Sequence, residues 1–103
     1  MIKVGEHITL DIIGTKHEYS SSFFEKIVYK IAKKAKVTVL EISKHKFEPQ
    51  GFTLVALLAE SHISFHTFPE NNIISFDFFT CGKVSPAVAV DIIKKEIKHK
   101  RIV

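Results

Sequence analysis

Apolar and polar residues alternate in four segments of this chain, which is the pattern of strands that bury one face. A continuous apolar run, Phe52–Ala59, is too short for a confident helix and predicts a central strand covered on both faces. The alternating segments that predict the other strands are His7–Ile13, Val37–Phe47, His62–Phe68 and Ile73–Thr80.

In two segments the apolar spacing lengthens to that of a helix. The first helix is predicted to begin at an N-cap in the run Ser20-Ser21-Ser22. Glu25, three residues after Ser22, completes a capping box. Ser85 is the expected N-cap of the second, with Pro86 at its first helical position. The residues expected to face the core are Phe24, Ile27, Val28, Ile31, Ala32 and Ala35 in the first helix and Val88, Ala89, Ile92, Ile93 and Ile97 in the second.

The predicted element order is β-α-β-β-β-β-α. Short turns between strands and two inserted helices predict an α+β two-layer sandwich, with an antiparallel sheet and both helices on one face. No linker, repeat or low-complexity tract interrupts the chain, so residues 1–103 are expected to form a single domain.

The four-residue connection Pro69–Asn72 predicts the register of a hairpin. If the hairpin is regular, Phe68 lies opposite Ile73, and Glu60 lies opposite Cys81. The single cysteine of the chain is thereby expected beside the Glu60-Ser61 bond.

Alternation divides this hairpin into an apolar face and a polar one. Ser61 has the parity of the apolar face, so a bend or bulge there is needed to direct its hydroxyl toward His66. The apolar face is expected to hold Ile63, Phe65, Ile74, Phe76 and Phe78, and the polar face His62, Ser64, His66, Ser75, Asp77 and Cys81.

Length and charge limit the classes of function. With 103 residues there is room for one core but little for a deep private cleft, so a site at a homo-oligomer interface is expected. Fifteen Lys and Arg against 11 Asp and Glu give a charge of +4, and the lysines fall at helical spacing, as on solvated helix faces. One cysteine, no signal-peptide pattern and no apolar run of about 18 residues indicate a cytoplasmic protein outside the membrane.

These residue types alone leave several interpretations open. His62 and His66 fit hydrogen-bonded structural histidines, and Cys81 fits a small buried apolar residue. A zinc site of His62, His66 and Cys81 lacks the tight ligand spacing of structural zinc, and a Cys-His hydrolase lacks a local nucleophile signature.

One long stretch narrows the choice. Residues 60–70, ESHISFHTFPE, followed by DFFTCG at residues 77–82, closely resemble the processing and active-site region of the prokaryotic S-adenosylmethionine decarboxylase proenzymes. HKFEPQG at residues 45–51 and GEH at residues 5–7 are also similar to that family. The resemblance covers nearly the whole chain in order and spacing.

Membership would imply a self-processing enzyme. The family resemblance implies a cut between Glu60 and Ser61, giving a β chain of residues 1–60 and an α chain of residues 61–103. Ser61 would become a pyruvoyl group that forms a Schiff base with the substrate, so neither pyridoxal phosphate nor a metal is expected. His66 matches the family's proton acceptor in processing, and Cys81 its catalytic proton donor.

The resemblance also implies the substrate site and the assembly. Phe47 and Phe68 match aromatic residues around the adenine, Glu70 matches the acid that binds the ribose, and Thr53 matches a residue that assists processing. The expected substrate is S-adenosylmethionine, and the expected assembly is a homodimer of αβ units. Three departures bear on processing rate and substrate choice: Phe68 replaces a common tryptophan, Thr53 a usual serine, and Leu54 a usual small residue.

Two other functions compete with this one. The same scaffold hosts pyruvoyl-dependent decarboxylases of arginine or ornithine, since a fold does not determine a substrate. A basic module that binds nucleic acid is a third interpretation, but the aromatic platform of sheet-surface RNA binders is not evident. The aromatic pair and Glu70 favour the nucleoside-bearing substrate, which would make the protein a supplier of the aminopropyl donor for spermidine.

Overall fold

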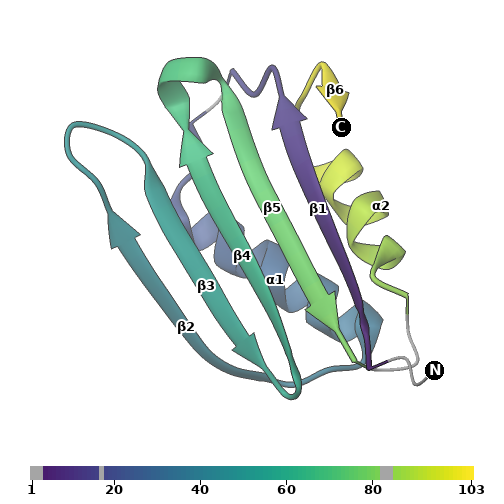
Figure 1. Cartoon of the computed structure of the whole chain (residues 1–103). Helices are drawn as coiled ribbons and strands as arrows, with labels where there is room; N and C mark the ends of the chain where they lie inside the picture. Colours follow the sequence, from purple (N-terminus) through teal and green to yellow (C-terminus); the bar gives the residue numbers. More distant parts are fainter. Residues whose placement is uncertain (1–3, 17, 82–84) are drawn as a thin grey trace.

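Six strands form one sheet in the order β2-β3-β4-β5-β1-β6, and every neighbouring pair is antiparallel (Figure 1). This computed structural model describes residues 4–16, 18–81 and 85–103. The strands are β1 (Glu6–Ile13), β2 (Val39–Lys46), β3 (Phe52–Leu58), β4 (Ser61–Phe68), β5 (Ile73–Thr80) and β6 (Arg101–Ile102), and the helices are α1 (Ser21–Ala35), α2 (Ala87–Glu96) and a short 3-10 helix (Pro69–Asn71).

Both helices pack on one face of the sheet, behind the strands in Figure 1. The predicted α+β two-layer architecture and element order are confirmed, and only the two-residue β6 and the 3-10 helix were not expected. Neither helix in the described part of the chain has the length and hydropathy needed to cross a bilayer.

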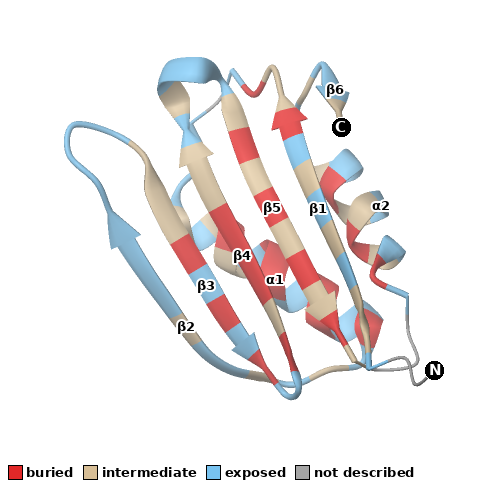
Figure 2. Ribbon diagram, viewed as in Figure 1, coloured by how far each residue is buried: buried red, intermediate tan, exposed pale blue. Residues whose placement is uncertain are grey.

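The core lies between the helices and the covered face of the sheet. Buried positions alternate with half-buried or exposed ones along β3 and β5, as the red bands of Figure 2 show, while three successive residues of β4, Ile63–Phe65, are buried. The aromatic centre of this core is Phe65, whose ring lies 4.9 Å from that of Phe24 and 5.0 Å from that of Phe76, measured between centroids. All six residues predicted to face inward from the first helix are buried.

The predicted run of three serines does supply the N-cap of α1, but the predicted capping box between Ser22 and Glu25 was wrong. Ser20 is the N-cap, and its Oγ accepts a hydrogen bond of 3.2 Å from the backbone N–H of Phe23. Glu25 therefore lies too far into the helix to close a capping box, and it pairs with Lys44 of β2 at 2.8 Å. At α2 the helix begins one residue later than predicted, while Ser85 Oγ still accepts from a first-turn N–H at 3.2 Å.

β3 was predicted to be covered on both faces, and in this chain it is covered on one. Leu54, Ala56 and Leu58 are buried, whereas Val55 and Leu57 are 41% and 50% exposed. The reason is that both helices pack on the same side. The other side of the sheet, named the open face, carries Val55, Leu57 and the polar residues of the β4–β5 hairpin.

The predicted hairpin register is confirmed. Phe68 pairs with Ile73, and Ser64 pairs with Asp77. Since side chains alternate along both strands, this register brings Ser64, His66 and Asp77 to the open face.

Replacing Phe65 with alanine should lower the free energy of unfolding by about 3–5 kcal/mol, because the large ring is fully buried between two others. Urea denaturation at a fixed protein concentration measures the change. Tyr29→Ala, at a position 57% exposed on α1, is the control and should change it by about 0.5 kcal/mol or less. Equal losses in the two variants would contradict this assignment of the core.

Candidate active site

The turn between β3 and β4 contains the bond at which the chain is predicted to cut itself. Leu58 pairs with Ser61, so Ala59 and Glu60 form a two-residue turn. Glu60 has a φ of 61°, a left-handed conformation that costs a non-glycine residue on the order of 1–2 kcal/mol. The sharp bend thus lies at Glu60, one residue before the predicted position, and Ser61 keeps the parity of the covered face.

The hydroxyl of Ser61 is buried without a partner. Ser61 is 6% exposed, and of the described residues it has the one buried side-chain oxygen or nitrogen that makes no hydrogen bond. Leaving such a group unpaired costs about 1–3 kcal/mol. Because no hydrogen bond restrains it, this hydroxyl can rotate about its Cα–Cβ bond toward its own backbone.

Cys81 lies where the hairpin register predicted, against the same turn. Its thiol donates a hydrogen bond to the backbone carbonyl oxygen of Glu60. A donor at this oxygen draws electron density from the carbonyl carbon and favours attack on it. The structure therefore brings together three predicted site residues, Glu60, Ser61 and Cys81.

A second group of predicted residues lies at the other end of β4. His66 pairs with Thr53 of β3, and the Thr53 hydroxyl lies 3.0 Å from Nδ1 of the imidazole. Both residues line a cavity of about 320 Å³ together with all three predicted substrate-binding residues, Phe47, Phe68 and Glu70.

The loop between β2 and β3 shapes this cavity. Gly51 has a φ of 91°, which favours glycine, and its carbonyl accepts a 2.8 Å hydrogen bond from the N–H of Phe47. Gln50 donates to the Glu70 carboxylate at 3.0 Å. Phe47 and Phe68 remain 48% and 42% exposed, so both rings are available to a ligand.

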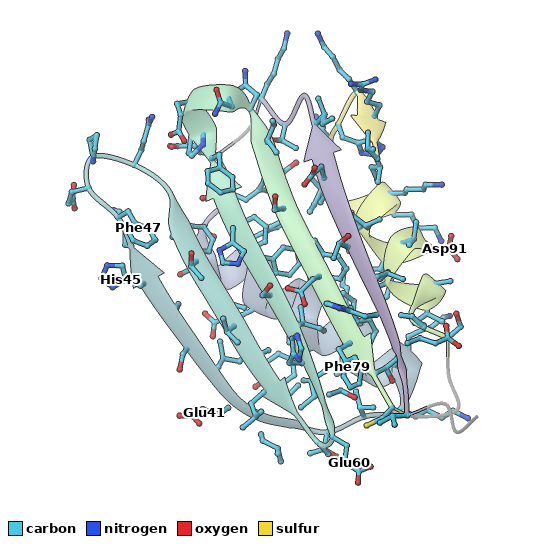
Figure 3. The ribbon with its side chains drawn as sticks, viewed as in Figure 1. Glu41, His45, Phe47, Glu60, Phe79 and Asp91 are labelled. Carbon is cyan, nitrogen blue, oxygen red and sulfur yellow. The ribbon has the colours of Figure 1, made fainter. Side chains whose placement is uncertain are left out.

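Within one chain the two groups do not meet. Ser61 and His66 are five residues apart on one strand, roughly 16 Å at about 3.3 Å per residue, and their side chains have opposite parity. Figure 3 shows Phe47 and Glu60 at opposite ends of the sheet. The hypothetical zinc set of His62, His66 and Cys81 is likewise not assembled, since His66 lies at the far end.

Sequence reasoning missed one feature of the open face. Asp77 Oδ1 lies 2.9 Å from Nε2 of His7 and 3.0 Å from Nε2 of His62, and Oδ2 accepts from the Ser64 hydroxyl. Partial burial opposes ionisation of Asp77, but the hydrogen bonds from Ser64, His7 and His62 outweigh it and lower the pKa of this carboxyl. The pairing of β1 with β5, which no local pattern predicts, brings His7 to this group.

The side chains of His7, His62 and Asp77 could also hold a metal ion. Their ligand atoms all lie within 4.8 Å of one another. However, two imidazole N–H groups and one hydroxyl already satisfy the carboxylate, so the arrangement needs no metal to be stable.

A larger cavity, about 940 Å³, opens between the start of α1 and the loop from β2 to β3. None of the predicted site residues lines it. Its size therefore does not make it the better candidate for the chemistry.

Known proteins resemble this chain over nearly its whole length. The family model for S-adenosylmethionine decarboxylase matches residues 6–103. An S-adenosylmethionine decarboxylase proenzyme of Prochlorococcus marinus is 40% identical over 100 residues, covering 94% of this chain and 80% of that protein. One from Methanococcus maripaludis is 38% identical over 105 residues, covering 99% and 86%.

A solved structure agrees with these sequences. The crystal structure of the adenosylmethionine decarboxylase from Aquifex aeolicus superposes with a TM-score of 0.81 at 33% identity, covering 97% of this chain and 85% of that one. Similarity of this extent in sequence, and in the strand arrangement that brings Cys81 to Glu60, makes the chain a member of the S-adenosylmethionine decarboxylase family.

Proposed function

We propose that this protein is a self-processing, pyruvoyl-dependent S-adenosylmethionine decarboxylase, which releases CO₂ and produces the aminopropyl donor for spermidine biosynthesis. The observation that supports it most is the Ser61 hydroxyl, buried and without a partner, next to a Glu60 carbonyl that accepts the Cys81 thiol. The names of the relatives favour this substrate, and no observation favours arginine or ornithine.

Processing starts with attack of Ser61 Oγ on the carbonyl carbon of Glu60, which converts the peptide bond to an ester. The Cys81 thiol stabilises the negative charge that develops on the carbonyl oxygen. Removal of the Ser61 Cα proton then expels the Glu60 carboxylate and leaves a dehydroalanine. Its hydrolysis releases ammonia and gives a pyruvoyl group at the start of the α chain, residues 61–103, separate from the β chain, residues 1–60.

The unpaired hydroxyl and the left-handed Glu60 both suit this reaction. The hydroxyl loses no hydrogen bond when it turns toward the carbonyl, and a strained turn is relieved when the peptide is converted. The residues present therefore fit a pyruvoyl group derived from Ser61. Once formed, that group would bind the substrate amine as a Schiff base and accept electrons as CO₂ leaves.

The base for processing would come from a second copy of the chain. His66 is held by Thr53 through Nδ1, which leaves Nε2 to exchange a proton, but it lies roughly 16 Å from Ser61 of its own chain. In a twofold dimer with the open faces in contact and the axis running across the strands, the Ser61 end of one β4 would meet the His66 end of the other. Val55 and Leu57, exposed on that face, would be buried by the contact.

The same dimer would complete the substrate site. The cavity of Phe47, Phe68 and Glu70 would then lie over the Cys81 end of the partner chain. The phenyl rings can stack on adenine and attract the sulfonium, and the carboxylate can accept hydrogen bonds from the ribose hydroxyls. Cys81 would return a proton to the former α-carbon after CO₂ leaves.

Intact mass under denaturing conditions tests the proposed function directly. Wild-type protein should give two chains divided after Glu60, and Ser61→Ala should give one uncut chain because it lacks the nucleophile. Ser22→Ala, which removes an exposed hydroxyl on α1, should cut like the wild type. A wild-type chain that stays whole after prolonged incubation would count decisively against the proposal.

Cys81→Ala should still show some cutting, but its kcat for CO₂ release should fall about 100-fold or more because the proton donor is lost. Release of labelled CO₂ by the cut fraction of this variant measures the effect. Normal turnover would exclude Cys81 as the donor.

Mixed dimers test the sharing of the site. His66→Ala and Ser61→Ala should each stay uncut alone, but refolding them together at equal amounts should cut about half of the His66→Ala chains, because random pairing puts half of them beside an intact His66. Intact mass measures the cut fraction, and native mass spectrometry verifies the mixed dimers. Mixed dimers without any cut chain would refute the shared site.

Glu70→Gln should raise the KM for S-adenosylmethionine about tenfold or more with a smaller change in kcat, because a hydrogen bond to a charged group contributes about 1.5–3 kcal/mol. Glu41→Gln, at an exposed position outside the cavity, is the control. Labelled arginine and ornithine are assayed in parallel, and preferential turnover of either would assign the chain to that substrate instead.

A further inference from the structure

The group of His7, His62 and Asp77 has no part in the proposed steps of cutting and decarboxylation. Its three members come from β1, β4 and β5, and they meet on the open face. The imidazole of His62 also stacks on Phe79, with ring centroids 6.0 Å apart and planes at 17°. Figure 3 shows Phe79 toward the end of the sheet at which Glu60 lies.

The hydrogen bonds determine which nitrogen of each imidazole carries a proton. An ionised carboxylate only accepts, so His7 and His62 must both present Nε2–H to Asp77 Oδ1. With the Ser64 hydroxyl on Oδ2, the carboxylate receives three hydrogen bonds. Asp77 thus orients His62 from β5, the strand that also leads to Cys81.

The position of His62 in the chain makes this contact relevant to the reaction. His62 directly follows Ser61, the residue expected to become the pyruvoyl group. Before the cut, residue 61 is held on one side by the tight turn through Glu60 and on the other by the rest of β4. After the cut it becomes a chain end, and chain ends fray unless neighbouring residues hold them.

The cut would also separate the members of the group between two chains. His7 would belong to the β chain, while His62 and Asp77 would belong to the α chain. Asp77 therefore contacts both products and ties the new chain end to β1.

We propose that Asp77 is a positioning residue: it holds His62, and through it the residue at the cut, in line with Cys81 once the turn has been severed. This inference rests on the proposed function. Asp77 would then have little influence on the rate of the cut and a large influence on the rate of decarboxylation by the cut enzyme.

Asp77→Asn tests the inference, because the amide keeps the size of the side chain but cannot accept from both imidazoles at one negatively charged oxygen. Cutting should proceed within about twofold of the wild-type rate. The cut enzyme should lose about tenfold or more in kcat while its KM changes about twofold or less, the pattern for loss of alignment in the reacting state.

Hydrogen exchange provides a readout independent of activity. In cut enzyme, Asp77→Asn should raise the amide exchange rate of residues 62–66 about tenfold, since residue 61 no longer carries an N–H. In uncut protein carrying Ser61→Ala, the same substitution should raise it about twofold or less, because the turn still holds this segment. If the group contributed only to general stability, Asp77→Asn would raise the exchange rate equally in the cut and the uncut protein.

Asp11→Asn is the matched control. Asp11 lies on β1, on the same face, and accepts a 3.0 Å hydrogen bond from Ser75 without touching His62. It should leave kcat and the amide exchange of residues 62–66 unchanged. If Asp77→Asn fails to fold, His62→Leu breaks the same link to the residue at the cut and should give the same pattern.

The outcomes separate the two claims. A wild-type chain that does not cut would overturn the proposed function and the positioning role with it. Wild-type cutting and turnover, together with an Asp77→Asn enzyme that has normal kcat or equal exchange in cut and uncut forms, would overturn the positioning role alone.

Discussion

The strict alternation of side chains along β4 and β5 is the constraint on which the rest of this protein depends. Every second residue packs against the helices, as Phe65 and Phe76 do, and the residues between them must face the other way. The same short hairpin therefore builds the aromatic core and displays His66 and Asp77 on the open face. A shift of one residue in register would bury the polar set and expose the core.

The length of β4 explains why so small a chain would need a partner. A strand of eight residues separates its ends by more than any side chain spans, so Ser61 and His66 cannot meet within one copy. A twofold axis that runs across β4 would reverse one copy of the strand relative to the other, so a single interface would form two complete sites. The half-covered state of β3, with Val55 and Leu57 exposed, is consistent with such a contact.

Predictions from the sequence succeeded where the determining interactions are local. The connection from Pro69 to Asn72 is short enough that its length sets the register of the β4–β5 hairpin, and this placed Cys81 at Glu60. The N-cap of α1 lies in the predicted run of three serines, but the capping box was misassigned to Ser22, because each serine can accept from an N–H ahead of it and only the helix start selects one. The coverage of β3 was misjudged because an apolar run does not tell how many layers cover it.

Local patterning was thus sufficient for the strands, the helices, the α+β architecture and the family resemblance of the segment around Ser61. It could not decide which distant segments become neighbours. The pairing of β1 with β5 brings His7 to Asp77 across 70 residues of chain, and the packing of both helices on one side leaves the Ser61 hydroxyl buried without a partner. Contacts of that kind depend on how whole helices and strands pack against one another. The hydrophobic periodicity along the chain does not determine that packing.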